Sequence, residues 1–192
     1  MKDYIPLSVP TLKGNELKYI KECIDSEWVS SAGKYVDLFE ENISDYTGAK
    51  YAIACVNGTA ALQVSLQLAG VEPGDEVIVS TLTFIASVNA ITYNNAKPIF
   101  IDVDKYYNLD EEKTIEFIKN ETFFKNGFTY NINNNSKIRA IIPVHVWGNA
   151  CQFNKLINLC KKRNITVVED AAESLGTFYN NGKHTGTIGK LG

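Results

Sequence analysis

Residues 51–80 form the stretch that decides the fold class: YAIACVNGTAALQVSLQLAGVEPGDEVIVS. The apolar run at 51–56 predicts a strand that ends in a tight turn. The helix-forming residues at 59–69 predict a helix, which Gly70 closes as a C-terminal cap. Residues 76–80 are mostly apolar and predict a second strand. The stretch is therefore a strand–helix–strand unit.

The same alternation runs through the rest of the chain. Short strands that are apolar on both faces are typical of buried parallel strands, so an α/β fold is expected, with a mostly parallel sheet flanked by helices. No repeat or linker divides residues 1–192. Residues 120–136 are polar and asparagine-rich and predict a surface excursion, or alternatively an insert near a subunit contact. Further helices are expected at 13–28, 34–46, 84–93, 152–163 and after the N-cap Asp110, and further strands at 97–102, 139–144 and 165–169.

Composition excludes several classes of protein. The chain has 192 residues and a net charge of -3, and its basic residues neither dominate nor cluster, so no nucleic-acid partner is expected. No apolar run is long enough to span a bilayer, and no apolar segment of a signal peptide follows Lys2. A cytoplasmic protein that does not enter the membrane is the expectation.

The cysteine pattern agrees with a reducing compartment. Cys23, Cys55, Cys151 and Cys160 contain no C-x-x-C pair and lie in apolar or helical segments. Free buried thiols are expected rather than disulfides or a zinc site. A catalytic cysteine remains an alternative.

In open α/β sheets, ligands bind beyond the carboxyl ends of the strands, so the residues after each expected strand are the candidates. Gly58 and Thr59 begin a helix after the first strand. A glycine there allows close backbone approach, and the free N–H groups and helix dipole favour a phosphate. The alternative is an ordinary helix N-cap.

Two other strand ends offer different chemistry. Phe84 follows the strand at 76–80 and can lie flat on a planar ligand, or simply pack in the core. Glu169 and Asp170 close the strand at 165–169, and a carboxylate there can keep a ring nitrogen protonated. The same acids can instead cap the following turn or bind a divalent metal.

These segments occur in a recognisable order. Residues 57–62 (NGTAAL), Thr83-Phe84, 145–148 (HVWG) and 169–172 (EDAA) together resemble the DegT/DnrJ/EryC1/StrS family of sugar aminotransferases. The resemblance covers essentially the whole chain. It implies the aspartate-aminotransferase-like fold of type I, with residues 1–192 forming part of the large domain that binds pyridoxal 5'-phosphate (PLP).

The resemblance also implies roles for single residues. Gly58 and Thr59 would bind the phosphate through their N–H groups, Phe84 would stack on the pyridine ring, and Asp170 would pair with its nitrogen. Glu173 lies where the family often has His or Gln near the phenolic oxygen, so its role is open, because a carboxylate and a phenolate repel unless they share a proton.

Three residues are weaker substrate-site candidates. Trp28 and Ser31 would lie in a loop that approaches the sugar nucleotide. His145 follows a strand and can reach the site, or it is a structural histidine held by neighbouring backbone.

The implied function is transamination, in which glutamate gives its amino group to a nucleotide-linked keto-deoxy sugar for bacterial surface polysaccharides. The family's covalent cofactor lysine follows shortly after the position of Gly192, so this chain without it is expected to have little turnover. A sugar dehydratase of the same family, which has histidine in place of the lysine, and a non-catalytic fragment are alternatives. Family members are homodimers, so a homodimer is expected.

Overall fold

The computed structural model describes residues 4–6 and 9–192. Its helices are α1 (Glu16–Asp25), α2 (Lys34–Thr47), α3 (Gly58–Leu68), α4 (Ile85–Tyr93), α5 (Glu111–Asn120) and α6 (Asn154–Arg163), with a short 3-10 turn at Val146–Gly148. Its strands are β1 (Glu76–Ser80), β2 (Lys97–Ile101), β3 (Thr122–Lys125), β4 (Phe128–Asn131), β5 (Lys137–Ile142) and β6 (Thr166–Val167).

The sheet is mostly parallel, as expected. Its order is β2-β1-β5-β4-β3, and β6 pairs with β5 beside β4. The β1–β2, β1–β5 and β5–β6 pairings are parallel, whereas β4 pairs antiparallel with both β3 and β5. Beyond β6, Val168 forms a parallel bridge with Leu191, which brings the end of the chain against the sheet.

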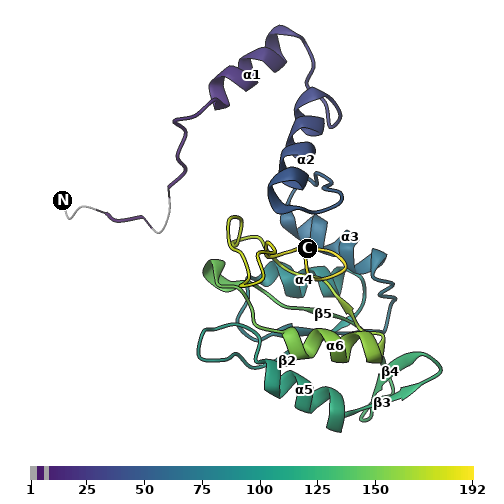
Figure 1. Ribbon diagram of the computed structural model, residues 1–192. Coiled ribbons are helices and arrows are strands. Elements are labelled where there is room, and N and C mark those ends of the chain that lie inside the picture. The colour runs from purple at the N-terminus through teal and green to yellow at the C-terminus, as the bar shows by residue number, and fades with distance from the viewer. Residues whose placement is uncertain (1–3, 7–8) are drawn as a thin grey trace.

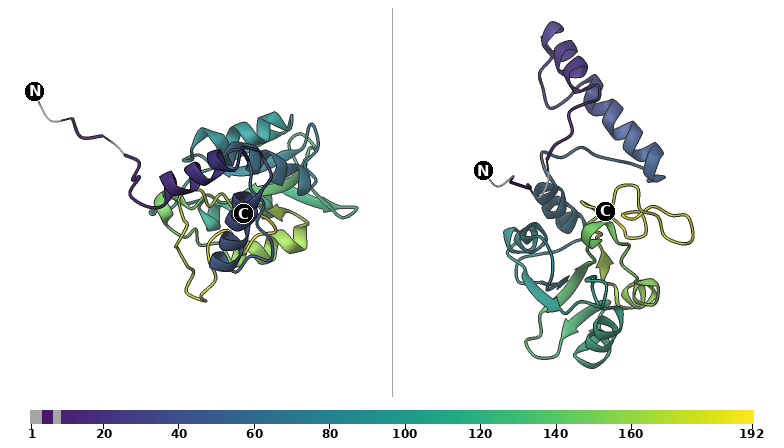
Figure 2. Two further views of the ribbon diagram at one scale, coloured as in Figure 1. Left: turned by 90° about the horizontal axis from the view of Figure 1, so that it is seen from above. Right: turned by 90° about the vertical axis from the view of Figure 1, so that its left-hand side faces the viewer.

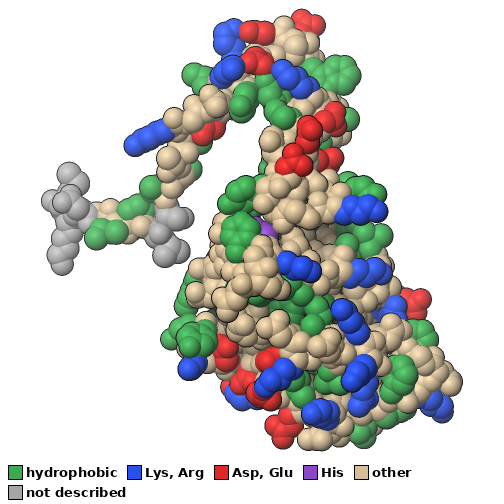
Figure 3. All heavy atoms as spheres, in the orientation of Figure 1, with side chains coloured by type: hydrophobic (Ala, Val, Ile, Leu, Met, Phe, Trp, Pro, Cys, Tyr) green, Lys and Arg blue, Asp and Glu red, His purple; other side chains and the backbone are tan. Residues whose placement is uncertain are grey.

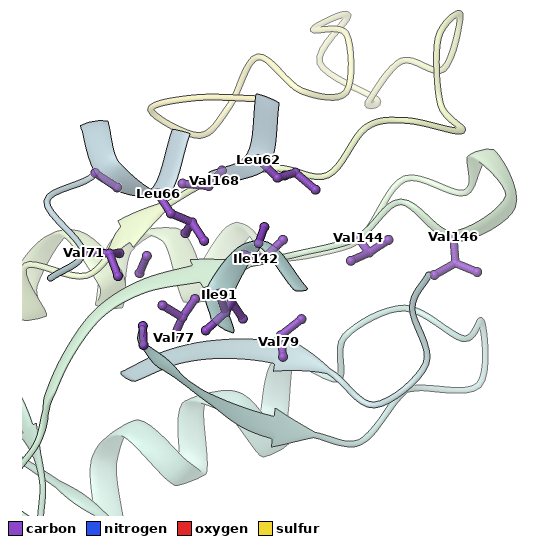
Figure 4. Packing of buried hydrophobic residues seen from close by; sticks show 14 residues of the cluster. Leu62, Leu66, Val71, Val77, Val79, Ile91, Ile142, Val144, Val146 and Val168 are labelled. Atoms are coloured by element: carbon purple, nitrogen blue, oxygen red, sulfur yellow. The ribbon is translucent and has the colours of Figure 1, made fainter. Parts of the chain in front are cut away.

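Helices cover both faces of this sheet. Leu62 and Leu66 of α3 and Ile91 of α4 pack with β1 and β5 on one face (Figure 4). Ile118 of α5 and Leu156 of α6 pack on the other face (Figure 1). Strand β1 is therefore buried along its whole length. The α/β class predicted from the alternating pattern is confirmed.

The strand expected at 51–56 is absent. No described strand pairs with this segment, and Tyr51, Ile53 and Val56 are exposed. An apolar run becomes a strand only when a neighbour satisfies its backbone groups, and here it has none. Cys55 is consequently exposed, which corrects the expectation of a buried thiol, whereas Cys151 and Cys160 are buried and all four thiols are free.

The segment 120–136 contains a hairpin that the sequence reasoning did not include. Asn126 and Gly127 connect β3 to β4 with positive φ values of 51° and 81°. Asn-Gly is the pair that favours such two-residue hairpin turns. The signal was present, but the surrounding asparagines obscured it.

Helices α1 and α2 form an arm that projects from the α/β body (Figures 1 and 2). Neither helix contains a buried residue. The arm is anchored at its base, where Glu40 Oε1 accepts from Ala54 N at 2.7 Å and the Tyr46 ring lies 5.8 Å from that of His184. Within the described ranges, no helix is both long and apolar enough to cross a membrane.

Candidate active site

The candidate site lies at the carboxyl ends of the parallel strands. Figure 4 shows Leu62, near the start of α3, on the side of Val79 and Val144, and Leu66 nearer Val77. The N-terminus of α3 therefore lies at the edge where β1 ends. Helix α4 begins at that edge too, because only four residues separate it from β1.

The start of α3 has the geometry of an anion site. Asn57 caps the helix, and its Oδ1 accepts from Ala60 N at 2.9 Å. Among the described residues, nothing accepts from the backbone N–H of Gly58 or Thr59. A Cβ added at Gly58 would meet no atom within 4 Å. Two donors and the positive end of a helix dipole thus face open space.

Asp170 is held in place by a serine that the sequence reasoning missed. Ser87 Oγ donates to Asp170 Oδ2 at 2.6 Å, and Thr83 Oγ1 lies 3.0 Å from Ser87 Oγ. Of the residues that the structure describes, only Ala172 donates to Oδ1, through its backbone N at 3.3 Å. Asp170 is 8% exposed, so it is nearly buried yet keeps acceptor capacity. The only advance signal was the position of Ser87, about one helical turn after Phe84.

Phe84 is available to a ligand. It is the N-cap residue of α4 in an extended conformation, and its side chain is 78% exposed. It is therefore not part of the core, which removes the packing alternative. The ring lies three residues before Ser87, so one short segment supplies both an aromatic surface and the support for Asp170.

Glu169 has a different environment from its neighbour. Its Oε2 accepts from His145 Nε2 at 2.9 Å, Tyr179 Oη at 3.2 Å and Gly186 N at 3.0 Å. Its Oε1 accepts from the backbone N–H groups of residues 188 and 189 at 2.7 and 2.5 Å. With five donors inside the chain, this carboxylate has no capacity left for a ligand.

His145 has the geometry of a structural histidine, which was the alternative to a role in the site. It is buried, and its Nδ1 accepts from Cys151 N at 3.0 Å. Since Nδ1 is an acceptor, the proton lies on Nε2 and is donated to Glu169. Both ring nitrogens are thus occupied within the chain. Its contribution to substrate binding stays a prediction, and the structure offers it no free nitrogen.

Glu173 lies on the loop that follows Asp170. Its Oε2 accepts from Trp147 N at 2.7 Å, and no described residue donates to Oε1. The side chain is exposed. Glu173 thus shares the site edge with Asp170 while one of its oxygens stays available.

Trp28 and Ser31 are not brought to this edge. They lie in the turn between α1 and α2, at the end of the projecting arm (Figure 1). Trp28 is exposed, and its Nε1 donates to Ala32 O at 2.7 Å. Their role in substrate binding remains a prediction from the resemblance.

Two alternative chemistries find little support in the described residues. They contain no group of three or more His, Cys, Asp or Glu side chains that could hold a metal ion. Burial raises the pKa of the Cys160 thiol to about 12 and that of Cys151 still further above its ordinary value. Both thiols are therefore protonated and poor nucleophiles at neutral pH.

Comparison with known proteins decides the family. Residues 10–192 match the DegT/DnrJ/EryC1/StrS aminotransferase family. The GDP-perosamine synthase of Caulobacter vibrioides is 41% identical over 96% of this chain and 46% of its own length. The chain belongs to the DegT/DnrJ/EryC1/StrS aminotransferase family. It spans about half the length of the curated relatives that it matches.

Solved structures of this aminotransferase family have the same fold. The aminotransferase from Psychrobacter cryohalolentis has a TM-score of 0.80 at 32% identity, over 96% of this chain and 43% of that one. The E. coli GDP-4-keto-6-deoxy-D-mannose-3-dehydratase with bound hydrated PLP has a TM-score of 0.79 at 26% identity, over 96% and 44%. The type I fold is confirmed, and PLP is the cofactor of the family.

The residues present fit this cofactor. The free N–H groups of Gly58 and Thr59 match a phosphate, the exposed Phe84 ring matches a planar heterocycle, and Asp170 has an acceptor for a ring N–H. When bound, PLP supplies an electron-withdrawing ring that carries an amino group between substrates.

Proposed function

We propose that the chain forms the cofactor-binding part of an aminotransferase that moves an amino group from glutamate to a nucleotide-linked 4-keto-6-deoxy sugar. The observation that carries the proposal is the Ser87–Asp170 pair at the strand edge that α3 and Phe84 share. Buried, and held by one serine, the Asp170 carboxylate would hold a proton on a ring nitrogen.

The chain's own groups would divide the work. Gly58 and Thr59 would bind the phosphate through backbone N–H groups, and Phe84 would cover one face of the ring. Thr83 and Ser87 would keep Asp170 from rotating. Each group acts by position, so the site would need little rearrangement on binding.

The substrate class rests on relatives. The GDP-perosamine synthase, at 41% identity, favours a GDP-linked sugar and amination. The dehydratase alternative is supported by a more distant relative, at 26% identity. A homodimer is proposed as well, because hydrophobic side chains lie on the surface of the arm (Figure 3). Ile20 of α1 and Phe39 of α2 are among the exposed apolar residues.

Binding of pyridoxamine 5'-phosphate (PMP) tests the proposal, because this form needs no covalent bond to the protein. Titration of the purified protein followed by calorimetry should give saturable binding. Asp170→Ala should weaken it at least tenfold, since a hydrogen bond to a charged group is lost. Glu112→Gln, a surface change outside the site, should bind as wild type. Saturable binding with no loss in Asp170→Ala, or no binding at all, would contradict the proposal.

The reaction itself needs a separate assay. Because little turnover is expected, glutamate and a GDP-linked 4-keto-6-deoxy sugar are incubated for a long time with a high concentration of the protein and PLP, and any product is identified by mass spectrometry. An amino sugar supports transamination. A sugar that has lost a hydroxyl group without gaining nitrogen supports the dehydratase.

A further inference from the structure

The turn that contains Trp147 has an unusual backbone. Trp147 has φ 53° and ψ 29°, and Gly148 follows with φ 81°. A bulky aromatic residue with positive φ is rare and its backbone is strained. Trp147 is also 65% exposed, so burial of its side chain does not explain the conformation.

The surrounding residues hold this turn from two sides. Asn108 Oδ1 accepts from Val146 N at 3.2 Å, and Asn108 Nδ2 donates to Asn149 O at 3.4 Å. On the other side, Thr177 Oγ1 donates to Gly148 O at 2.8 Å. A Cβ at Gly148 would lie 3.1 Å from Glu173 O, so only glycine fits without a shift. The strained turn is thus fixed against residues 173–177.

The consequence is a single hydrogen bond from the turn to the side chain of Glu173. In its left-handed conformation, Trp147 donates its N–H to Glu173 Oε2 at 2.7 Å. Glu173 is an exposed, long side chain, and such a side chain ordinarily samples many rotamers. Fixing one oxygen before ligand binding leaves Oε1 oriented and reduces the entropy cost of using it.

We propose that the Val146–Gly148 turn is a positioning device for Glu173, with Trp147 acting through its backbone N–H and Gly148 and Thr177 keeping the turn in place. The inference rests on the proposed function and on the family resemblance, which implies that Glu173 lies near the phenolic oxygen of the cofactor. It adds that Glu173 contributes only while this turn is left-handed.

A double-mutant cycle tests this coupling through the affinity for PMP. Glu173→Ala removes the carboxyl group that would share a proton with the phenolic oxygen, and should weaken binding roughly tenfold. Gly148→Ala forces the turn to shift and should weaken it by a similar factor. In the Glu173→Ala background, Gly148→Ala should have no further effect, because the turn acts only through Glu173. Thr177→Val is a milder variant with the same expected pattern, should Gly148→Ala fail to fold.

Gly127→Ala is the matched control. Gly127 has the same φ of 81°, lies in the β3–β4 turn and has no atom within 4 Å of an added Cβ. It should share the backbone strain of Gly148→Ala but leave PMP affinity unchanged. A loss of affinity in Gly127→Ala as large as that in Gly148→Ala would overturn the inference, because it would show a general effect of instability.

Amide exchange of Trp147, measured by NMR without cofactor, gives a second readout. The N–H should exchange slowly in the wild type and at least tenfold faster in Glu173→Ala. Additive losses of affinity in the double mutant, or an unchanged exchange rate, would overturn the inference while the proposed function stands. Absence of PMP binding in the wild type would instead remove the proposed function and this inference with it.

Discussion

Glu169 and Asp170 are adjacent in the sequence, yet their carboxylates differ in what they can still bind. Glu169 accepts five hydrogen bonds from His145, Tyr179 and the backbone of 186–189. Asp170 accepts two and keeps free acceptor capacity. Successive residues of extended backbone point to opposite sides, so Glu169 anchors the C-terminal loop while Asp170 keeps acceptor capacity for the proposed cofactor.

Glu169→Gln should be strongly destabilising. An amide places two N–H donors against groups that are themselves donors, so at least one buried donor loses its partner. We expect the free energy of unfolding at pH 7 to fall by about 3 kcal/mol, measured by urea denaturation. Glu112→Gln, which breaks the exposed ion pair with Lys155, should change it by less than about 0.5 kcal/mol.

The difference in unfolding free energy between wild type and Glu169→Gln should change with pH in a defined direction. Burial alone would raise the pKa of Glu169, but hydrogen bonds from His145 and from the N–H groups of Gly189 and Gly186 lower it below the ordinary 4.5. A lowered folded-state pKa stabilises the protein fully above the unfolded value and progressively less as pH falls through the folded value. The gap between wild type and Glu169→Gln should therefore narrow below pH 4.5. A constant gap down to pH 3 would contradict the role of this ionised carboxylate.

At the scale of elements, a substitution at the N-cap of α3 should change ligand binding without lowering the stability of the fold. Asn57→Asp keeps a good N-cap and favours the helix dipole, so the unfolding free energy should stay equal or rise slightly. The added negative charge would repel a bound phosphate, so PMP affinity should drop about tenfold. Thermal unfolding and calorimetry measure the two effects.

Helix α5 provides the control for this change. Asp110 caps it in the same way, with its Oδ1 accepting from Lys113 N at 3.0 Å. Asp110→Asn changes the charge of a cap away from the site and should leave PMP affinity unaltered. Wild-type affinity in Asn57→Asp would argue against phosphate binding at α3.

The elements also show how far local sequence patterns reach. Helices α2 to α6 and strands β1 and β2 follow from periodicity, caps and turns, and the cap at Asp110 was predicted. The prediction of a strand at 51–56 was wrong, because strand formation depends on pairing with a segment that is distant in the sequence. The strand expected at 165–169 shortens to Thr166–Val167 in β6, since Val168 bridges the end of the chain instead.

The candidate site divides along the same line. Gly58 begins helix α3, and Phe84 and Asp170 follow strands β1 and β6, so a local pattern marks each of them. Ser87 and Trp147 act through contacts 83 and 26 residues away in sequence, and neither has a local signature of that contact. These two contacts could not be predicted from the sequence, because they form only when the folded chain brings distant segments together.

At the scale of the whole molecule, the arm formed by α1 and α2 exposes apolar side chains to solvent and has no buried residue. An apolar cleft of about 670 Å³ lies between the two helices, and its lining includes Ile20, Leu38 and Phe39. Tyr35 Oη donates to Glu22, which joins the helices by a polar contact at one end. Exposed apolar surface of this kind usually marks a protein interface.

A homodimer that buries this arm should therefore be sensitive to charge on it. Phe39→Glu, at a residue that is 56% exposed in the single chain, should raise the dimer dissociation constant by about 10–100-fold, because the two protomers together lose roughly 1.5–3 kcal/mol of apolar burial. Leu68→Glu, at a comparably exposed position on α3, should leave the dimer intact. Sedimentation velocity over a range of concentrations measures both. A wild type that sediments as a monomer, or a Phe39→Glu variant that dimerises as well as wild type, would place the interface elsewhere or remove it.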